Sequence, residues 1–401
     1  MATNEGGAAS VVVVGGGIAG LSLCAALRAP GAPRRRVTVV ERATRLSAVG
    51  SGLVLYPNGI KAADAANPDL GARIRAAGHV PGPGDARPLV APDGTVLSAD
   101  PIGGLADRFG APQVSLLRYA LQQALIATTG DAELITGASV DCHSDHGDHV
   151  SVELSTGDTI RADLLVGADG VNSRTRRRLF DDGAPVYRGY TSLRGRSSVP
   201  RCYPNGVTVA GDGIDLFVAP VGGGRVYWTA KVVAEQGDWP ALDAGTALAA
   251  LLRRIRDWHP PIVDMIRRTD RESGIVITDI CDRDPIDDWA RGRGVLIGDA
   301  AHPMSPAMGQ GASMALEDAA ELGALLNALP QDVPGALKDF CAVRAPRTAE
   351  IVLESRRKGG VDSKASRGAD VRARAANEFT TEDERLAGLF GWRPRVWEGT
   401  R

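Results

Sequence analysis

The sequence predicts an α/β fold in which a Rossmann-like, dinucleotide-binding domain is interleaved with a domain built on an antiparallel sheet, followed by a C-terminal helical segment. Three observations lead to this prediction. A β-branched run near the N-terminus ends in a glycine-rich turn that opens a helix. Two later buried-strand patterns each end in a turn containing aspartate. Between those two lie several short strand-like runs separated by Gly or Pro.

Composition limits the classes of function. The 401 residues, 44% of them apolar, can bury more than one small core. Lys+Arg (46) nearly balance Asp+Glu (48), so no overall charge attracts nucleic acid or an anionic membrane. Five widely spaced cysteines without a CxxC pair argue against a disulfide framework or a metal site. With no signal peptide and no membrane span recognisable, we expect a cytoplasmic protein whose partner is a small molecule.

The first forty residues read as a βαβ unit. Residues 11–14 form a strand, 18–28 a helix and 36–41 a second strand, joined by a right-handed crossover. The Pro- and Gly-rich segment 78–112 has little periodicity and is expected to leave the dinucleotide-binding domain. Residues 116–127 return to a helical pattern.

The second half of the chain alternates between two kinds of pattern. Residues 150–166 predict a hairpin followed by a buried strand, and residues 187–231 predict several antiparallel strands. The remaining expected elements are a helix at 247–255, strands at 276–280 and 295–297, a helix at 312–329, and an Arg-rich helical tail from 350. The expected domains are 1–78, 113–180 and 281–345 for the dinucleotide, 79–112 and 181–280 for the substrate, and 346–401 for the C-terminal helical segment.

The glycine-rich turn has the spacing Gly15-x-Gly17-x-x-Gly20 between a strand and a helix. The first glycine allows a tight turn, the second lets the backbone approach a pyrophosphate, and the third lets helix and strand pack closely. The helix N-terminus offers free N–H groups and a partial positive charge to the phosphates. Glu41 ends the following strand and is placed to accept hydrogen bonds from a ribose diol.

Two later motifs place carboxylates at strand ends. Residues 164–166 form a buried strand before a turn containing Asp169, and residues 295–297 form another that delivers Asp299 to a loop. The next helix begins near Gly311 and Ala312, and its N-terminus could stabilise negative charge on a flavin ring. Taken alone, the Asp169 motif is equally well explained as an ordinary Asp-Gly turn at the end of a strand.

Together, the three motifs resemble the class A flavoprotein monooxygenases, the para-hydroxybenzoate hydroxylase superfamily, and most closely its salicylate-hydroxylase-like branch. The resemblance covers residues 11 to about 357. It implies a GR2-type FAD-binding domain with non-covalent FAD, NADH or NADPH as a transient co-substrate, and O2. In that family a flavin C4a-hydroperoxide hydroxylates or epoxidises an aromatic or other electron-rich small molecule.

The resemblance also implies the cofactor-binding residues. Glu41 would hold the adenosine ribose, Arg42 would lie beside the adenine, and Asp299 would bind the ribityl chain. The full expected set is Gly15, Gly17, Ala19, Gly20, Glu41, Arg42, Gly52, Arg118, Asp169, Asp299, Gly311 and Ala312. Gly52 belongs to a loop, with Gly50 and Ser51, that resembles the family's loop beside the mobile flavin. His302, Arg344 and Arg347 match the family more loosely, and structural roles explain them at least as well.

Substrate positioning is assigned to Arg194, Tyr227 and Phe217, which lie in the expected antiparallel strands. If Arg194 faces the flavin, it favours a substrate with a carboxylate, phenolate or ring carbonyl. Ordinary core packing explains aromatic residues in strands equally well.

Two other functions remain open at this point. One is an FAD-dependent reductase of the geranylgeranyl-reductase type, and the other is a flavin-binding protein without turnover. Whether the chain is a monomer or a homodimer, and whether it prefers NADH or NADPH, is also open.

Overall fold

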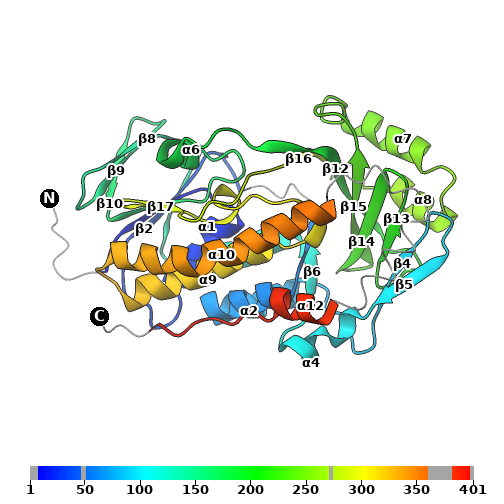
Figure 1. Ribbon diagram of the computed structural model, residues 1–401, viewed down its shortest axis with the longest axis horizontal. Coiled ribbons are helices and arrows are strands. Elements are labelled where there is room, and N and C mark those ends of the chain that lie inside the picture. Colours follow the sequence, from blue (N-terminus) through cyan, green and yellow to red (C-terminus); the bar gives the residue numbers. More distant parts are fainter. Residues whose placement is uncertain (1–7, 47–50, 271–273, 360–381, 398–401) are drawn as a thin grey trace.

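A six-stranded sheet forms one half of the molecule in the computed structural model, which describes residues 8–46, 51–270, 274–359 and 382–397. The strand order is β17-β18-β11-β1-β2-β7, and every pair is parallel except β17 with β18. Its strands are β1 Val11–Val14, β2 Val37–Glu41, β7 Glu133–Thr136, β11 Leu164–Gly167, β17 Ala290–Arg291 and β18 Gly294–Leu296. Strands far apart in the chain therefore lie side by side (Figure 1).

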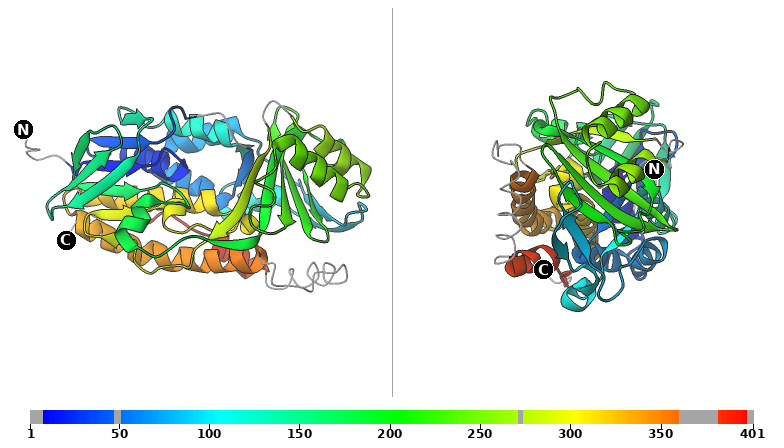
Figure 2. Two further views of the ribbon diagram at one scale, coloured as in Figure 1. Left: turned by 90° about the horizontal axis from the view of Figure 1, so that it is seen from above. Right: turned by 90° about the vertical axis from the view of Figure 1, so that its right-hand side faces the viewer.

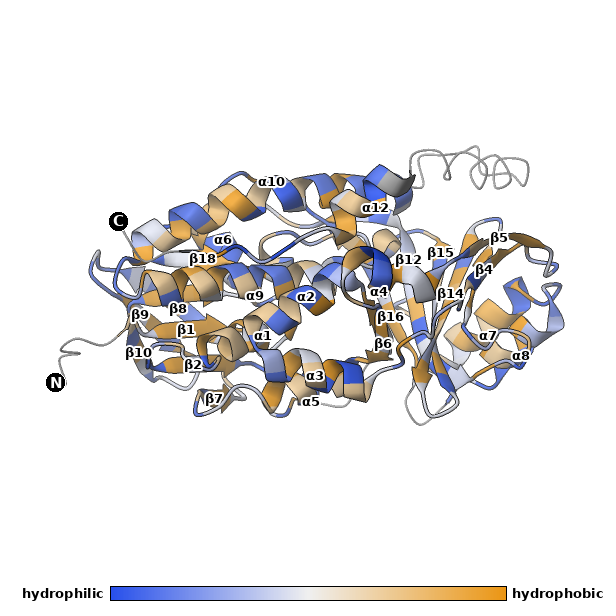
Figure 3. Cartoon of the chain, turned by 90° about the horizontal axis from the view of Figure 1, so that it is seen from below, coloured by the Kyte–Doolittle hydropathy of each residue, from blue (hydrophilic) through white to orange (hydrophobic). Residues whose placement is uncertain are grey.

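The central strand β1 is buried on both faces, which explains its uninterrupted apolar sequence (Figure 3). Val11 and Val13 pack with three helices on one face, while Val12 and Val14 pack against a small antiparallel sheet on the other. The helices are α1 Ile18–Leu27, α9 Gly311–Ala328 and α10 Val333–Gly359. The small sheet contains β8 Val140–Asp145, β9 Val150–Leu154 and β10 Thr159–Ala162.

A seven-stranded sheet forms the other half (Figures 1 and 2). Its order is β16-β12-β15-β14-β13-β4-β5, and only β13 with β4 is parallel. The strands are β4 Arg87–Val90, β5 Val96–Asp100, β12 Val186–Ser198, β13 Val207–Ala210, β14 Ile214–Gly222, β15 Arg225–Val233 and β16 Val276–Asp282. Helices α7 Ala244–Arg254 and α8 Pro260–Arg267 cover one of its faces.

A two-stranded sheet connects the two halves. It pairs β3 Gly52–Leu55 with β6 Val114–Leu117, and Val54 packs with Ala219 and Tyr227 of the seven-stranded sheet. The remaining elements are α2 Pro57–Ala66, α3 Pro68–Ala77, η1 Ile102–Gly104, α4 Leu105–Phe109, α5 Arg118–Ile126, α6 Arg174–Phe180, η2 Gly298–Ala300, η3 Pro306–Met308 and α12 Glu382–Phe390. Within the described ranges, no helix is long and apolar enough to cross a membrane.

The predicted fold class is confirmed, but three local expectations differ from the structure. The helix expected at 116–127 begins only at Arg118, because the two preceding leucines pair with β3. The segment 78–112 contains two strands that the sequence did not indicate, β4 and β5. The boundary expected at 345/346 falls inside helix α10, next to Pro346. Part of the expected C-terminal segment lies outside the described residues.

Candidate active site

The glycine-rich turn has three glycines with different surroundings. Gly15 has φ +113°, and a Cβ there would lie 2.4 Å from the carbonyl oxygen of Ala168. A Cβ on Gly20 would lie 2.0 Å from the carbonyl oxygen of Gly15, whereas one on Gly17 would meet nothing within 4 Å. Gly15 and Gly20 are therefore required by close packing inside the protein. Gly17 faces open space beside the N-terminus of α1, where a pyrophosphate would fit.

Glu41 lies beside this turn. One carboxylate oxygen accepts a 2.8 Å hydrogen bond from the Gly16 N–H, and the other accepts one of 2.8 Å from the Ala43 N–H. The side chain of Arg42 is exposed, and Ala19 is buried on the helix. These bonds hold the carboxylate next to the glycine turn, and its contact with a ribose stays a prediction.

Arg118 lies across from the turn. It begins helix α5, and its backbone N–H donates to the Ser51 carbonyl oxygen at 3.0 Å. Arg118 and Gly17 line the same small cavity of about 50 Å³, together with residues of α1 and α5. A cation and free helix N–H groups therefore share one space, which favours an anionic group there.

Asp299 lies in η2, just before helix α9. It is exposed, yet desolvation raises the pKa of its carboxyl against the positive charges of His302 and Arg118. A side chain that is both exposed and desolvated lies in a hollow rather than on a convex surface. A Cβ on Gly311 would lie 3.8 Å from Asp299 Oδ1, so the start of α9 borders the same hollow, with Ala312 next in the helix.

Asp169 is hydrogen-bonded within the protein. Its carboxylate accepts hydrogen bonds from Ser173 Oγ at 2.5 Å, the Arg174 N–H at 2.8 Å and the Thr175 N–H at 3.1 Å. These bonds hold the first turn of α6, so Asp169 fixes the loop that packs against Gly15. A direct contact with a cofactor stays a prediction for this residue.

Arg194, Tyr227 and Phe217 share one face of the seven-stranded sheet. Thr229 lies directly opposite Arg194 on one neighbouring strand and opposite Phe217 on the other, so these side chains share a face. Tyr227 is two residues before Thr229 on the same strand, and it therefore points to that face as well. Helices α7 and α8 cover the opposite face, where Trp228 is buried. The three predicted substrate residues therefore face β3 and β6, toward the half of the molecule that contains the glycine turn.

Tyr227 is in direct contact with the predicted flavin-side loop. A Cβ on Gly52 would lie 2.5 Å from the Tyr227 ring, and Gly50 of that loop lies outside the described residues. The Phe217 and Tyr227 rings are 5.9 Å apart between centroids. Burial raises the pKa of Tyr227, which therefore stays protonated at neutral pH.

Arg194 has a buried Nε that forms no hydrogen bond in the part of the chain that the structure describes. Burial lowers the pKa of Arg194, the positive charge of Arg118 lowers it further, and Tyr227 raises it. A desolvated guanidinium with an unpaired N–H favours an anionic or carbonyl ligand.

Sequence reasoning missed two residues at this site, Tyr56 and Arg87. Tyr56 lies between β3 and α2, and its ring stacks on Phe390 with 5.0 Å between centroids. Arg87 is 3% exposed and lies 4.7 Å above the Phe217 ring. Tyr56 stands next to Pro57-Asn58, which carried part of the resemblance. Arg87 gave no signal because the segment around it lacks strand alternation.

His302 belongs to a buried ion network rather than to the hollow. Its Nε2 lies 2.5 Å from an oxygen of Asp318, which also interacts with Arg344 at 2.8 Å. Arg347 contacts Glu317 at 2.7 Å, and Asn58 donates to the same carboxylate at 2.8 Å. These contacts favour a structural role for His302, Arg344 and Arg347.

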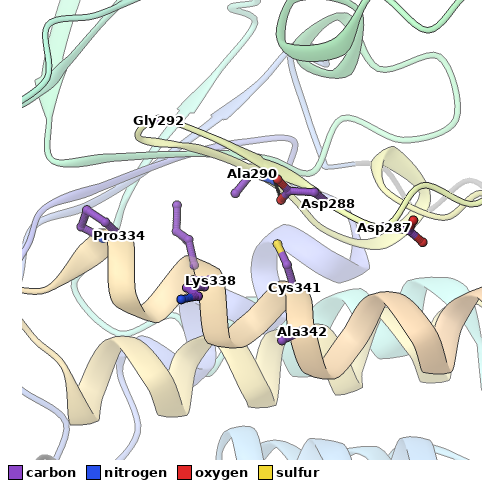
Figure 4. Close-up of a pocket in the computed structure, with 9 residues that line it drawn as sticks. Asp287, Asp288, Ala290, Gly292, Pro334, Lys338, Cys341 and Ala342 are labelled. Carbon is purple, nitrogen blue, oxygen red and sulfur yellow. Dashed lines mark hydrogen bonds between the residues drawn. The ribbon is translucent and has the colours of Figure 1, made fainter. Parts of the chain in front are cut away.

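Another cavity lies away from these residues. It has a volume of about 510 Å³ and opens between β17 and α10, where Asp288, Lys338 and Cys341 line it (Figure 4). None of the predicted site residues lines this cavity. Among the described residues, no cluster of His, Cys, Asp or Glu could hold a metal ion.

Comparison with known proteins identifies the class. The FAD binding domain model matches residues 8–355. The chain is 38% identical over 354 residues to the aurachin C monooxygenase/isomerase of Stigmatella aurantiaca, covering 88% of this chain and 89% of that protein. It is 34% identical over 359 residues to the 3-amino-4-hydroxybenzoate 2-monooxygenase of Streptomyces cremeus, covering 86% of each.

A solved structure leads to the same class. Klebsiella pneumoniae HpxO, complexed with FAD and uric acid, matches with a TM-score of 0.82 and 27% identity, covering 96% of each chain. The chain belongs to the FAD-binding-domain family, within the class A flavoprotein monooxygenases. It is an FAD-dependent monooxygenase, so the predicted cofactor and reaction class are confirmed.

Proposed function

We propose that the chain hydroxylates or epoxidises a planar aromatic small molecule held against the Arg194 face of the seven-stranded sheet. One observation carries this proposal: Arg194, Tyr227 and Phe217 lie on the face turned away from α7 and α8. The relatives named for hydroxybenzoate and urate-type rings support an aromatic substrate class.

The proposed FAD site runs from the glycine turn to the start of α9. Gly17 and Arg118 would hold the pyrophosphate, Glu41 the ribose, Asp299 the ribityl chain, and Gly311 the flavin ring. Bound FAD, reduced by NADH or NADPH, supplies activated oxygen from O2. The remaining cofactor residues would act through the backbone or, for Asp169, by fixing a loop.

The side chains on the sheet would orient the substrate. Arg194 can donate to a carboxylate, phenolate or ring carbonyl, and the protonated Tyr227 hydroxyl can donate to a second acceptor. The apolar cluster of Val54, Ala219 and Tyr227 would exclude water from one edge of the ring. Correct positioning matters because a displacement of about 1 Å can lower the rate on the order of 100-fold.

A substrate panel tests the function. Phenols, benzoates, indoles and quinolones would be scored for stimulated NAD(P)H oxidation and for a product carrying one added oxygen atom. A panel in which no aromatic compound yields an oxygenated product would contradict the proposed substrate class.

The FAD site is tested independently of turnover. Glu41→Ala removes a carboxylate expected to accept hydrogen bonds from the ribose, so FAD affinity should fall roughly 5- to 150-fold. Glu133→Ala, on the neighbouring strand β7, is the matched control and should leave FAD affinity unchanged. Equal FAD titrations for both variants would refute the placement.

We further propose that the protein acts in the cytoplasm on a freely diffusing small molecule, as a monomer or a homodimer. The five cysteines support a reducing compartment, because all are free and two of them are buried. Size-exclusion chromatography with light scattering distinguishes the two oligomeric states.

A further inference from the structure

Arg87 is a second buried cation on the face of the seven-stranded sheet that carries Arg194. It lies two residues before Leu89, which pairs with Thr208, and Thr208 pairs with Phe217. Arg87 therefore shares a face with Phe217, in agreement with the 4.7 Å contact between its guanidinium and that ring.

The guanidinium of Arg87 is incompletely paired. Arg87 is 97% buried by surface area, since only 3% is exposed, and its Nε and Nη2 have no hydrogen-bond partner. Asp100 lies directly across on β5, but in the part of the chain that the structure describes it forms no hydrogen bond with Nε or Nη2 of Arg87. Burial raises the pKa of Asp100, opposed by Arg87 and Arg385. A buried donor left unpaired is unfavourable, which indicates that a ligand completes the site.

Arg87 and Arg194 lie on opposite sides of the Phe217 and Tyr227 pair, on strands at different positions in the sheet. β12, which carries Arg194, is separated from β4 by β15, β14 and β13, so their backbones lie roughly 19 Å apart at the usual strand spacing. Both cations nevertheless act on Tyr227, whose pKa they lower against the larger effect of burial. Arg87 lies over the Phe217 ring, and Arg194 lies on the same face of the sheet as Phe217 and Tyr227.

We propose that Arg87 is a specificity-determining residue that binds an anionic oxygen of the substrate, at the end opposite the one held by Arg194. This inference rests on the proposed function, because it places the aromatic ring between the two arginines. Tyr56 would support the same end, since Arg87 and Tyr56 interact and the Tyr56 ring is fixed by Phe390. The expected substrate class is a planar ring with acceptor oxygens at both ends, at least one of them anionic.

Ligand binding to the FAD-loaded protein tests this inference without turnover. The probes are 3-hydroxybenzoate with its neutral analogue 3-hydroxybenzamide, and 1-hydroxy-2-naphthoate with 1-hydroxy-2-naphthamide, titrated by the change in flavin absorbance. Wild type should prefer the carboxylate of at least one pair by roughly 10- to 100-fold, the size expected for a hydrogen bond to a charged group. Arg87→Met should abolish that preference and leave the affinity for the amide within about threefold.

Two further variants serve as a matched control and as a charge-conserving substitution. Arg254→Met is the matched control, because Arg254 stacks 5.3 Å from the Trp239 ring on the covered side of the sheet, and it should keep the preference. Arg87→Lys retains the positive charge and should keep part of the preference even if Arg87→Met does not fold.

Three results would overturn the inference: no carboxylate preference in wild type, a preference that survives in Arg87→Met, or an equal loss for carboxylate and amide. A preference abolished by Arg194→Met but not by Arg87→Met would have the same effect. Failure of the proposed function is a separate result, because it is measured as the absence of oxygenated product.

Discussion

Asp299 shows how one residue can favour cofactor binding at the expense of the apoprotein. Desolvation in its hollow raises the pKa of its carboxyl, so the folded protein binds that proton more tightly than the unfolded chain. The apoprotein therefore loses stability as the pH rises from about 4, the ordinary value for aspartate, toward the raised pKa. Ionisation of this carboxyl therefore lowers the stability of the folded apoprotein.

We therefore expect opposite effects from Asp299→Asn. The apoprotein should need more urea to unfold at pH 7, with the difference disappearing near pH 3, while FAD binding should weaken because an acceptor is lost. Urea unfolding of the apoprotein between pH 3 and 7 and FAD titration measure the two effects. Asp257→Asn, at an exposed ion pair with Arg256, is the control and should change neither. A less stable apoprotein would contradict the argument.

Arg194 should control where the oxygen goes rather than whether electrons flow. In Arg194→Met the substrate loses its partner, so NAD(P)H oxidation should continue while product per NAD(P)H falls and hydrogen peroxide rises. The matched control is Arg225→Met, since Arg225 is the exposed first residue of β15 and pairs with Asp270. Fully coupled turnover in Arg194→Met would exclude this residue from the site.

The orientation of these side chains could not be obtained from sequence. Tyr227 and Trp228 are adjacent and both are buried, but they point to opposite faces of β15. Hydrophobicity does not distinguish the two faces, because one is covered by α7 and α8 and the other by β3. Only the register with neighbouring strands places Arg194 and Tyr227 together.

At the scale of single elements, the strand-turn-helix at the N-terminus contains one glycine needed for folding, Gly20, and one expected to serve cofactor binding, Gly17. Gly20→Ala would place a Cβ 2.0 Å from the Gly15 carbonyl oxygen, so it should destabilise the apoprotein. Gly17→Ala meets no protein atom within 4 Å, so the apoprotein should keep its stability while FAD affinity falls. Thermal unfolding of both apoproteins and FAD titration measure this contrast, which fails if Gly17→Ala unfolds as readily as Gly20→Ala.

Helices and strands whose own apolar pattern reflects their burial could be predicted from the sequence. Strand β1 and helix α9 agree closely with the expected ranges, because their apolar patterns reflect burial along the element itself. Strands β4 and β6 were missed for the opposite reason. β6 is extended because its leucines pair with β3, and β4 is extended because it lies between β5 and β13, a strand that comes much later in the chain.

At the scale of the whole molecule, a buried ion network ties η2, α2, α9 and α10 together. Burial alone would raise the pKa of Asp318, but His302 and Arg344 outweigh it and hold that pKa below its usual value. A depressed pKa contributes stability that is present above about pH 4 and lost as the pH falls below that value. Part of the acid sensitivity of the fold should therefore come from this one carboxylate.

Asp318→Asn tests that origin. It removes one of the two buried carboxylates that pair with Arg344, leaving only Glu317, so at pH 7 the free energy of unfolding should fall by about 3 to 5 kcal/mol. Its stability should also decline less steeply than that of wild type below about pH 4. Urea unfolding across this pH range measures both effects. Asp288→Asn, in an exposed pair with Arg291, should change the free energy by no more than about 1 kcal/mol. An unchanged acid slope would assign the sensitivity to other groups.

The order of strands in the parallel sheet also has a consequence for biosynthesis. β1 pairs on one side with β2, which emerges from the ribosome soon after it, and on the other side with β11, about 150 residues later. At about 5 to 20 residues per second, the apolar open edge of β1 waits on the order of 8 to 30 seconds for its partner. Nascent chains stalled in that interval should bind holdase chaperones and be degraded readily by proteases, because an open strand edge invites mispairing until β11 closes it.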